Sequence, residues 1–287
     1  MSGQAAPGVA GDFHGRPTRR LENGRCWLEV LAEAGPRIVR FGLVGGESVL
    51  AETPEIVWDG AFGRFELLGG HRVWFAPERP ECSIPDSTGL RLEGLDDVPH
   101  GLGVRLIGAV QEQIGLRKTI ELRLAPDSAA VEVRHILANV GGGPLELSVW
   151  PVTQLKPGGV ARVELPEPTP EHAFKPNRLL VLWPYSSWRD ERLALSDAEV
   201  SVTATPAPMI KIGCLSHAGR ITYERAGVVF AIAFDPAVDA RRPDMGCNVE
   251  IYSDATSIEL ETLGPLVRLG PGESAIHDER WELRRID

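Results

Sequence analysis

The alternation of apolar and polar residues, repeated along most of the chain, is the feature that most constrains its fold. In the segment 119–126, TIELRLAP, Ile120 and Leu122 share one face of an extended strand, and Glu121 and Arg123 share the other. Such alternation is typical of half-buried β-strands, whereas a helix repeats its apolar residues every three or four positions. The same pattern recurs in the segments 36–50, 101–110, 129–152, 199–213, 219–234 and 248–266.

Turn residues interrupt these runs. The sequence holds 31 glycines and 23 prolines, which leaves little room for long helices. The glycines at 141–143 separate two alternating runs and indicate a hairpin. We therefore predict an all-β protein, a single-domain antiparallel β-sandwich over residues 19–287 that follows a disordered leader over residues 1–18. The proline-rich segment 163–178 is predicted to be a surface loop.

Length, charge and cysteine spacing narrow the class of protein. No apolar stretch approaches the roughly 20 residues that cross a bilayer. We therefore expect no membrane span. A formal charge of −10 repels phosphate backbones, so a nucleic acid is not an expected partner either. The four cysteines match no zinc or redox spacing, which is typical of a cytoplasmic protein with reduced thiols. We expect a monomer or a homodimer.

The segment 248–262 predicts a hairpin that carries paired carboxylates. Pairing Ile251 with Leu260 keeps the apolar sides of two strands together and leaves a loop over residues 254–257. The same register sets Glu250 beside Glu261, and Tyr252 beside Glu259. Directly opposed carboxylates raise one pKa, which prepares a general base. The alternative is a solvated outer face on which the like charges are separated by water.

The segment 67–81, LLGGHRVWFAPERPE, sets polar side chains into an apolar run. Arg72 donates hydrogen bonds in a planar fork, and the indole of Trp74 suits the C–H face of a sugar ring. His71 and Glu78 lie beside them, and the two glycines would let the backbone approach a ligand. The alternative is a strand end in which Trp74 belongs to the core and Arg72 forms a structural ion pair.

Tryptophans and scattered polar residues add weaker signals. Trp150, Trp183 and Trp188 line a carbohydrate cleft in one interpretation and pack in the core in the other. His135 alternates with apolar residues, which favours a core histidine. Further candidate polar contacts are Lys156, Tyr185, Arg189 and Lys211.

Neither a phosphate-binding loop nor a serine-hydrolase motif is present, and we expect no cofactor and no metal ion. Carboxylates such as those of Asp244, Glu250 and Glu261, scattered along strands, do not specify a cation.

Four segments, 69–78, 135–159, 179–193 and 258–283, resemble the galactose mutarotase-like superfamily, and most closely a branch described only as a domain of unknown function. The resemblance spans about residues 20–285. It implies a β-supersandwich with a carbohydrate-sized cleft on the concave face of one sheet. Within the final segment it implies that Glu261 is the base acting on the anomeric hydroxyl. The GGHR motif is similar to the substrate-binding segment of hexose-phosphate epimerases, which implies His71 and Arg72.

One departure from the family pattern bears on catalysis. Aldose epimerases carry a histidine as general acid where this chain has Trp150 and Pro151. A positioned acid contributes roughly 10²- to 10⁴-fold to a rate. We hypothesise that His71 replaces it from another strand.

The sequence therefore predicts a carbohydrate-active protein, with epimerase or mutarotase chemistry on a sugar or sugar derivative. Glu261 and His71 would be the catalytic residues. Two alternatives stay open, namely a sugar-binding or sensing protein without catalysis, and a lyase or hydrolase acting on an acidic sugar. The predicted substrate-binding residues are Arg72, Trp74, Glu78, Trp150, Lys156, Tyr185 and Glu250.

Overall fold

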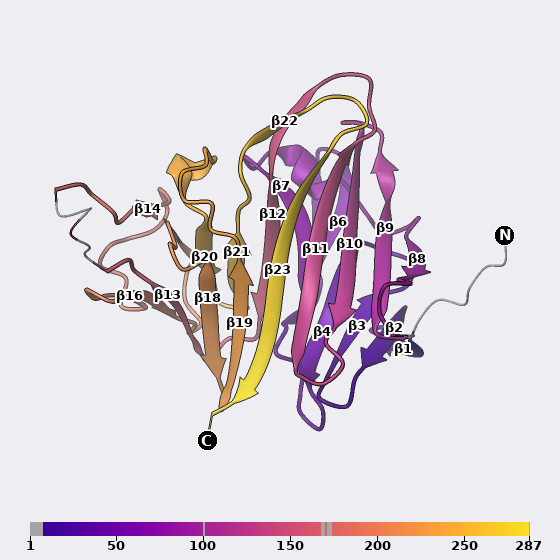
Figure 1. Ribbon diagram of the computed structural model, residues 1–287, viewed down its shortest axis with the longest axis horizontal. Coiled ribbons are helices and arrows are strands. Elements are labelled where there is room, and N and C mark those ends of the chain that lie inside the picture. The colour runs from indigo at the N-terminus through magenta and orange to yellow at the C-terminus, as the bar shows by residue number, and fades with distance from the viewer. Residues whose placement is uncertain (1–7, 100, 168–169, 171–173, 287) are drawn as a thin grey trace.

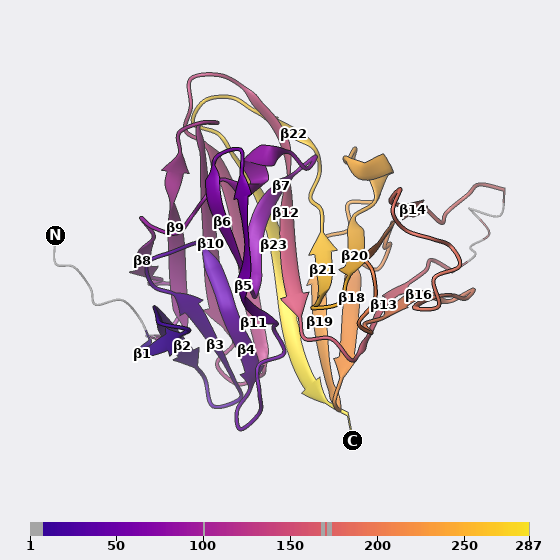
Figure 2. The same cartoon turned by 180° about the vertical axis from the view of Figure 1, so that it is seen from behind.

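Two large antiparallel sheets make up most of the molecule in the computed structural model, which describes residues 8–99, 101–167, 170 and 174–286. Figure 1 and Figure 2 show the sheets stacked face to face. The prediction of an all-β sandwich is confirmed. Among the described residues, no helix is long and apolar enough to span a membrane.

The first sheet has eleven strands. In spatial order they are β1 (Val9–Phe13), β2 (Arg16–Glu22), β3 (Cys26–Leu31), β4 (Arg37–Leu43), β7 (His71–Ala76), β12 (Leu145–Leu155), β21 (Ile258–Thr262), β20 (Val249–Ser253), β17 (Ile210–Cys214) and β14 (Leu180–Leu182), with β22 (Val267–Leu269) paired to β12.

The second sheet has ten strands. In spatial order they are β15 (Leu193–Leu195), β16 (Glu199–Thr203), β13 (Val160–Glu164), β18 (Arg220–Arg225), β19 (Val228–Phe234), β23 (Ser274–Arg285), β11 (Ala130–Asn139), β10 (Leu116–Leu124), β9 (Gly103–Gln111) and β8 (Arg91–Gly94). A separate hairpin joins β5 (Glu52–Gly60) to β6 (Gly63–Gly69), and short 3-10 turns lie at η1 (Pro80–Ser83) and η3 (Asp244–Gly246).

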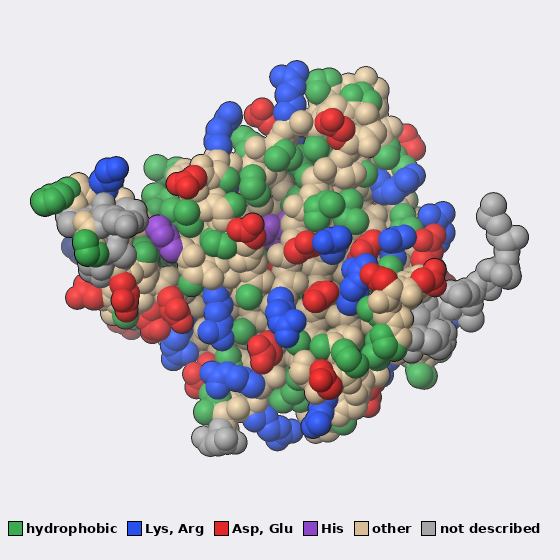
Figure 3. Space-filling model, viewed as in Figure 1, with side chains coloured by type: hydrophobic (Ala, Val, Ile, Leu, Met, Phe, Trp, Pro, Cys, Tyr) green, Lys and Arg blue, Asp and Glu red, His purple; other side chains and the backbone are tan. Residues whose placement is uncertain are grey.

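The apolar side chains of the alternating strands fill the space between the sheets. Phe41 of the eleven-stranded sheet packs against Phe230 and Trp281 of the ten-stranded sheet, with ring centroids 6.0 and 5.7 Å apart. We call the sheet faces that meet here the core faces and the opposite ones the outer faces. On the side seen in Figure 3, basic and acidic side chains are interspersed, as expected of a solvated face.

The predicted leader is wrong in its extent. Residues 9–13 and 16–22 form strands β1 and β2, which pair with each other, and β2 pairs with β3. Phe13 is fully buried in a small cluster with Leu31 and Val39, and that burial holds the N-terminal hairpin on the sheet. Residues 1–7 lie outside the described part of the chain. Of the predicted loop 163–178, residues 163–164 belong to β13, and 168–169 and 171–173 also lie outside the described residues.

Candidate functional site

The hairpin β20–β21 has the register that the sequence predicted. Glu250 pairs with Glu261, Ile251 with Leu260 and Tyr252 with Glu259. Ile251 and Leu260 are buried in the core between the sheets, and this burial fixes the register because a one-residue slip would turn them outward. The two glutamates therefore lie side by side on the outer face.

Lys211 of β17 binds both glutamates. Its Nζ lies 2.7 Å from Glu250 Oε2 and 2.8 Å from Glu261 Oε2. Glu250 is 1% and Glu261 0% exposed, so the alternative of a solvated face with separated like charges is wrong. Burial by itself would lower the pKa of Lys211, but the charges of Glu261 and Glu250 hold it well above its usual value. The ammonium is therefore a permanent cation between two buried carboxyl groups.

Glu250 is the proton-holding member of the pair. Burial raises its pKa to about 8, against the opposing effect of Lys211, and the charge of Glu261 raises it further. The thiol of Cys247 donates to Glu250 Oε1 at 3.3 Å. A carboxyl group with a raised pKa can act as a proton donor near neutral pH.

The two oxygens of Glu261 have different surroundings. Oε2 accepts hydrogen bonds from Trp150 Nε1 at 2.7 Å and from Lys211 Nζ at 2.8 Å. Oε1 has no hydrogen-bond partner among the described residues. One oxygen is thus held in place while the other keeps its capacity to accept a proton or a hydroxyl group.

Arg72 and Glu259 form a second ion pair on the same face. Arg72 donates to Glu259 Oε1 at 3.2 Å and to Gln154 Oε1 at 2.9 Å. Burial raises the pKa of Glu259 to about 7, although Arg72 opposes the rise. The guanidinium also lies over the ring of Trp74, 4.5 Å from its centroid. The ion pair that the sequence offered as an alternative for Arg72 is present, and it lies beside Glu261 rather than apart from it.

Aromatic side chains surround the two ion pairs. Trp74 and Trp150 meet edge to face, with ring centroids 5.5 Å apart. Lys211 Nζ lies over Trp150 and Trp183, 4.7 and 4.8 Å from their ring centroids. Tyr185, which is 47% exposed, lies within electrostatic reach of Lys211 and Glu261 at the rim. Indole faces beside polar groups are suited to a sugar ring.

Glu78, on the exposed turn after β7, is also within electrostatic reach of Lys211 and Glu261. Trp188 is 54% exposed, so the interpretation as a core residue is wrong for it.

His71 does not reach this face, and the prediction that it converges with Glu261 is wrong. Neighbouring residues of a strand point to opposite faces, so Arg72 on the outer face places His71 between the sheets. There its Nδ1 lies 2.9 Å from Thr153 Oγ1, and its Nε2 lies 2.8 Å from His135 Nε2. His135 is the core histidine that its pattern indicated, with 0% exposure.

The two glycines before His71 serve the path of the chain rather than a ligand. Gly69 and Gly70 have φ of +77° and +70° where β6 passes into β7. A Cβ atom would lie 2.2 Å from Ala51 O at Gly69 and 2.2 Å from Ile38 O at Gly70. Only glycine permits both the backbone conformation and this close packing.

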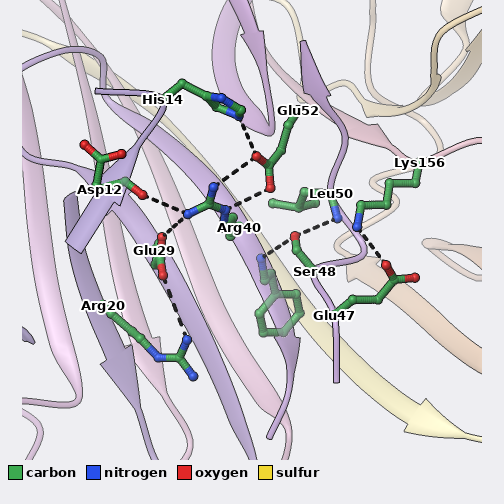
Figure 4. A network of polar contacts seen from close by, with 11 residues as sticks. Asp12, His14, Arg20, Glu29, Arg40, Glu47, Ser48, Leu50, Glu52 and Lys156 are labelled. Carbon is green, nitrogen blue, oxygen red and sulfur yellow. Dashed lines mark hydrogen bonds and ion pairs between the residues drawn. The ribbon is translucent and has the colours of Figure 1, made fainter. Parts of the chain in front are cut away.

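Lys156 is also misplaced by the sequence prediction. It follows the end of β12 and pairs with Glu47 at 3.0 Å, in the polar surface region that Figure 4 shows together with Arg40 and Glu52. Glu47 also accepts from Arg225 of β18. Lys156 therefore belongs to an exposed salt-bridge network and not to the group around Glu261.

Sequence reasoning named Lys211 only as a weak candidate polar contact and assigned no role to Glu259. The predicted hairpin register contained the signal for Glu259, which it placed on the face of Glu261. Lys211 is brought to Glu261 by the pairing of β17 with β20. These strands are far apart in the sequence, and no local pattern gives their register.

Access to Glu261 requires movement of the side chains above it. The residue is 0% exposed, and five surface cavities among the described residues are lined by neither Arg72, Lys211 nor Glu261. Trp183 and Tyr185 are only partly buried and belong to the segment between β14 and β15. None of these five cavities is the carbohydrate-sized cleft that the resemblance implied at Glu261.

No family model matches the sequence, and no curated protein matches it. Solved structures do match. A TPR-domain containing protein from Parabacteroides distasonis is 14% identical, with a TM-score of 0.64 over 95% of this chain, which spans 48% of that protein. A candidate aldose 1-epimerase from Klebsiella pneumoniae is 12% identical, with a TM-score of 0.60 over 97% of this chain and 82% of that one.

A galactose mutarotase-like protein from Lactobacillus casei is 11% identical, with a TM-score of 0.55 over 93% of this chain and 100% of that one. The identities are low, so these matches concern the fold. The chain has the galactose mutarotase-like fold that its sequence resemblance implied.

Proposed function

We propose that the chain binds a sugar on the outer face of the eleven-stranded sheet and interconverts its anomers or epimers there, with Glu261 as the base. The observation that supports this proposal best is the different hydrogen bonding of the two Glu261 oxygens. Trp150 and Lys211 hold Oε2, and Oε1 is left as an acceptor. A general base needs this orientation, because it must present a lone pair to a hydroxyl at a fixed position.

Glu250 supplies the acid that the family pattern assigns to a histidine. In mutarotation, Oε1 of Glu261 takes the proton of the anomeric hydroxyl, the bond between the anomeric carbon and the ring oxygen breaks, and the ring oxygen takes a proton. Glu250, with a pKa of about 8, carries a proton at neutral pH and lies beside Glu261. Reclosure of the open aldehyde from the other side returns both protons.

Charge balance favours a neutral sugar over an acidic one. With Glu250 protonated, the charges of Arg72 and Lys211 are balanced by those of Glu259 and Glu261. A carboxylate or phosphate on the ligand would meet these glutamates as well as the two cations. We therefore consider a lyase or hydrolase acting on an acidic sugar less well supported than an epimerase acting on a neutral sugar.

A sugar-binding protein without catalysis is the second candidate, and the complete burial of Glu261 favours it. In that case the ion pairs shape a rigid floor, and the partly buried Trp74, Trp183 and Tyr185 contact the ligand. Binding would be retained when the base is removed.

Exchange NMR on a panel of neutral aldoses tests the proposal. The unaltered protein should accelerate anomer exchange for at least one sugar, and Glu261→Gln should lower that rate by 10²-fold or more while it still binds the sugar. Lys156→Ala is the matched control, because its side chain lies outside the group. Saturation-transfer binding without any acceleration in the unaltered protein would instead establish the non-catalytic candidate. Absence of both would refute the proposal.

A further inference from the structure

Two histidines and a glutamate from three strands converge in the interior, away from the face that carries Glu261. His71 belongs to β7 of the eleven-stranded sheet, whereas His135 and Glu279 belong to β11 and β23 of the ten-stranded sheet. One potential ligand atom of each lies within 4.8 Å of those of the other two. Exposures of 0%, 0% and 3% place the cluster in the core. In Figure 1, β7 lies behind β11 and β23.

The hydrogen bonds of His135 leave its inner nitrogen unprotonated. His135 Nδ1 lies 2.9 Å from the backbone carbonyl of His277, which can only accept a hydrogen bond. Nδ1 therefore carries the proton of the neutral ring, and Nε2 presents a lone pair. A backbone carbonyl on the outer nitrogen is the arrangement that usually orients a metal-binding histidine.

His71 can present a second lone pair to the same point. Its Nδ1 is 2.9 Å from Thr153 Oγ1, which can accept a hydrogen bond as well as donate one. When Nδ1 donates to Thr153, the Nε2 atoms of His71 and His135, 2.8 Å apart, both carry lone pairs. Two facing lone pairs repel unless a proton or a metal ion lies between them.

Glu279 adds a buried carboxyl group without a matching cation. Thr262 Oγ1 donates to its Oε1 at 2.5 Å and Trp281 Nε1 to its Oε2 at 2.8 Å, and both donors are neutral. Among the described residues, no lysine or arginine lies within salt-bridge distance of this carboxyl group. A buried carboxylate is costly unless it is paired or binds a metal.

We propose that His71, His135 and Glu279 bind a divalent transition-metal ion of the zinc type in the core, where it ties the two sheets together. Two imidazole nitrogens and one carboxylate oxygen are a ligand set for Zn²⁺ and its neighbours in the first transition row rather than for Mg²⁺ or Ca²⁺. Bonds of about 2.0–2.1 Å around a tetrahedral ion separate two ligand atoms by roughly 3.3 Å. The two rings must therefore part by about half an ångström when the ion binds.

The role of such an ion is structural. The three protein ligands leave a fourth coordination position for a water molecule, but residues buried this completely give a substrate no route to the ion. Metal bound only by the folded chain contributes to the free energy of folding. Because His71 precedes Arg72 on β7, the ion would also fix the strand that presents Arg72 and Trp74 to the outer face. The site stands independently of the proposed epimerase activity.

Refolding tests the proposal with the unaltered full chain. The protein is unfolded, stripped of metal with a chelator, and refolded with Zn²⁺, with Co²⁺ or with chelator alone. We expect about one ion retained per chain after extensive dialysis, measured by mass spectrometry, and a higher melting temperature than that of the chelator sample. Co²⁺ bound to two histidines and a carboxylate should show visible absorption bands.

Variants separate this site from adventitious binding. Glu279→Gln and His135→Gln should each lower the retained metal at least tenfold, whereas His14→Gln, at a partly exposed histidine paired with Glu52, should retain it. Because a core variant can fail to fold, the cobalt spectrum of the unaltered chain stands as the second measurement. Metal content below a tenth of an ion per chain, with equal melting temperatures in all three samples, would mean that the two rings share only a proton and would overturn the proposal.

Discussion

Replacing Lys211 with methionine removes a cation that contacts both Glu250 and Glu261. Its Nζ lies 2.7 Å from Glu250 and 2.8 Å from Glu261, and both carboxyl groups are almost completely buried. Methionine keeps much of the apolar stem beside Trp150 and Trp183. The substitution therefore isolates the loss of charge from the loss of packing.

The expected cost follows from the burial. Removing one member of a buried ion pair typically destabilises a protein by about 3–5 kcal/mol, because the partner is left as an unpaired charge. Lys211 has two partners, Glu250 and Glu261. Glu250 has a pKa of about 8 even beside Lys211, so it can become neutral by binding a proton and then costs little. We therefore expect Lys211→Met to lose about 3–5 kcal/mol of unfolding free energy at pH 8.

The loss should depend on pH in a definite direction. The pKa of Glu250 in the folded protein lies above its unfolded value even beside Lys211, and loss of the ammonium removes an effect that lowers it. The stability of such groups is fully present at low pH and is lost as pH rises through the folded pKa. The penalty should therefore be smaller at pH 5 than at pH 8.

Urea unfolding followed by tryptophan fluorescence measures both quantities. Lys156→Met is the matched control, because its ammonium pairs with Glu47, whose side chain is 61% exposed, and should change stability by less than about 1 kcal/mol. A Lys211→Met variant within 1 kcal/mol of the unaltered protein at pH 8, or one with equal losses at pH 5 and pH 8, would refute the reasoning.

Three further predictions use the same unfolding and binding assays. The contribution of Glu250 to stability should fall as pH rises from about 4.5 to about 8, because its folded pKa is raised, so Glu250→Gln should flatten that part of the stability profile relative to the unaltered chain. Lys118 is buried with its pKa lowered by burial to about 8, so Lys118→Met should raise stability at pH 7 by about 3 kcal/mol, and a loss instead would contradict this. Trp150→Phe removes the Nε1 hydrogen bond to Glu261 and should slow anomer exchange about tenfold, measured by NMR, whereas an unchanged rate would show that this bond does not position the base.

The local sequence pattern was sufficient to predict the part of the candidate site that lies on the β20–β21 hairpin. The alternation in 248–262 was sufficient to place Glu250 beside Glu261 and Tyr252 beside Glu259, because Ile251 and Leu260 must both reach the core. The short loop between the strands leaves few other registers. The all-β fold followed from the same alternation along the chain.

In the segment 71–76, the sequence pattern does not show which side chains face the core and which face outward. Every residue of β7 is buried except Trp74, which is partly buried. One face of this strand packs against the ten-stranded sheet, and the other face lies among the ion pairs of the outer face. Alternation disappears when both faces of a strand are covered. The sequence pattern therefore does not separate His71 from Arg72, and it predicts a single site for both.

The sequence by itself determined the fold class and the local pairing of β20 with β21, since both depend on the period of apolar residues within a short stretch. Only the tertiary structure decided that Lys211 lies between the two glutamates, that His71 meets His135 in the core, and that Lys156 lies elsewhere. Each of these depends on strands that are distant in sequence, and their order and facing are set by the packing of one sheet on the other rather than by any local pattern.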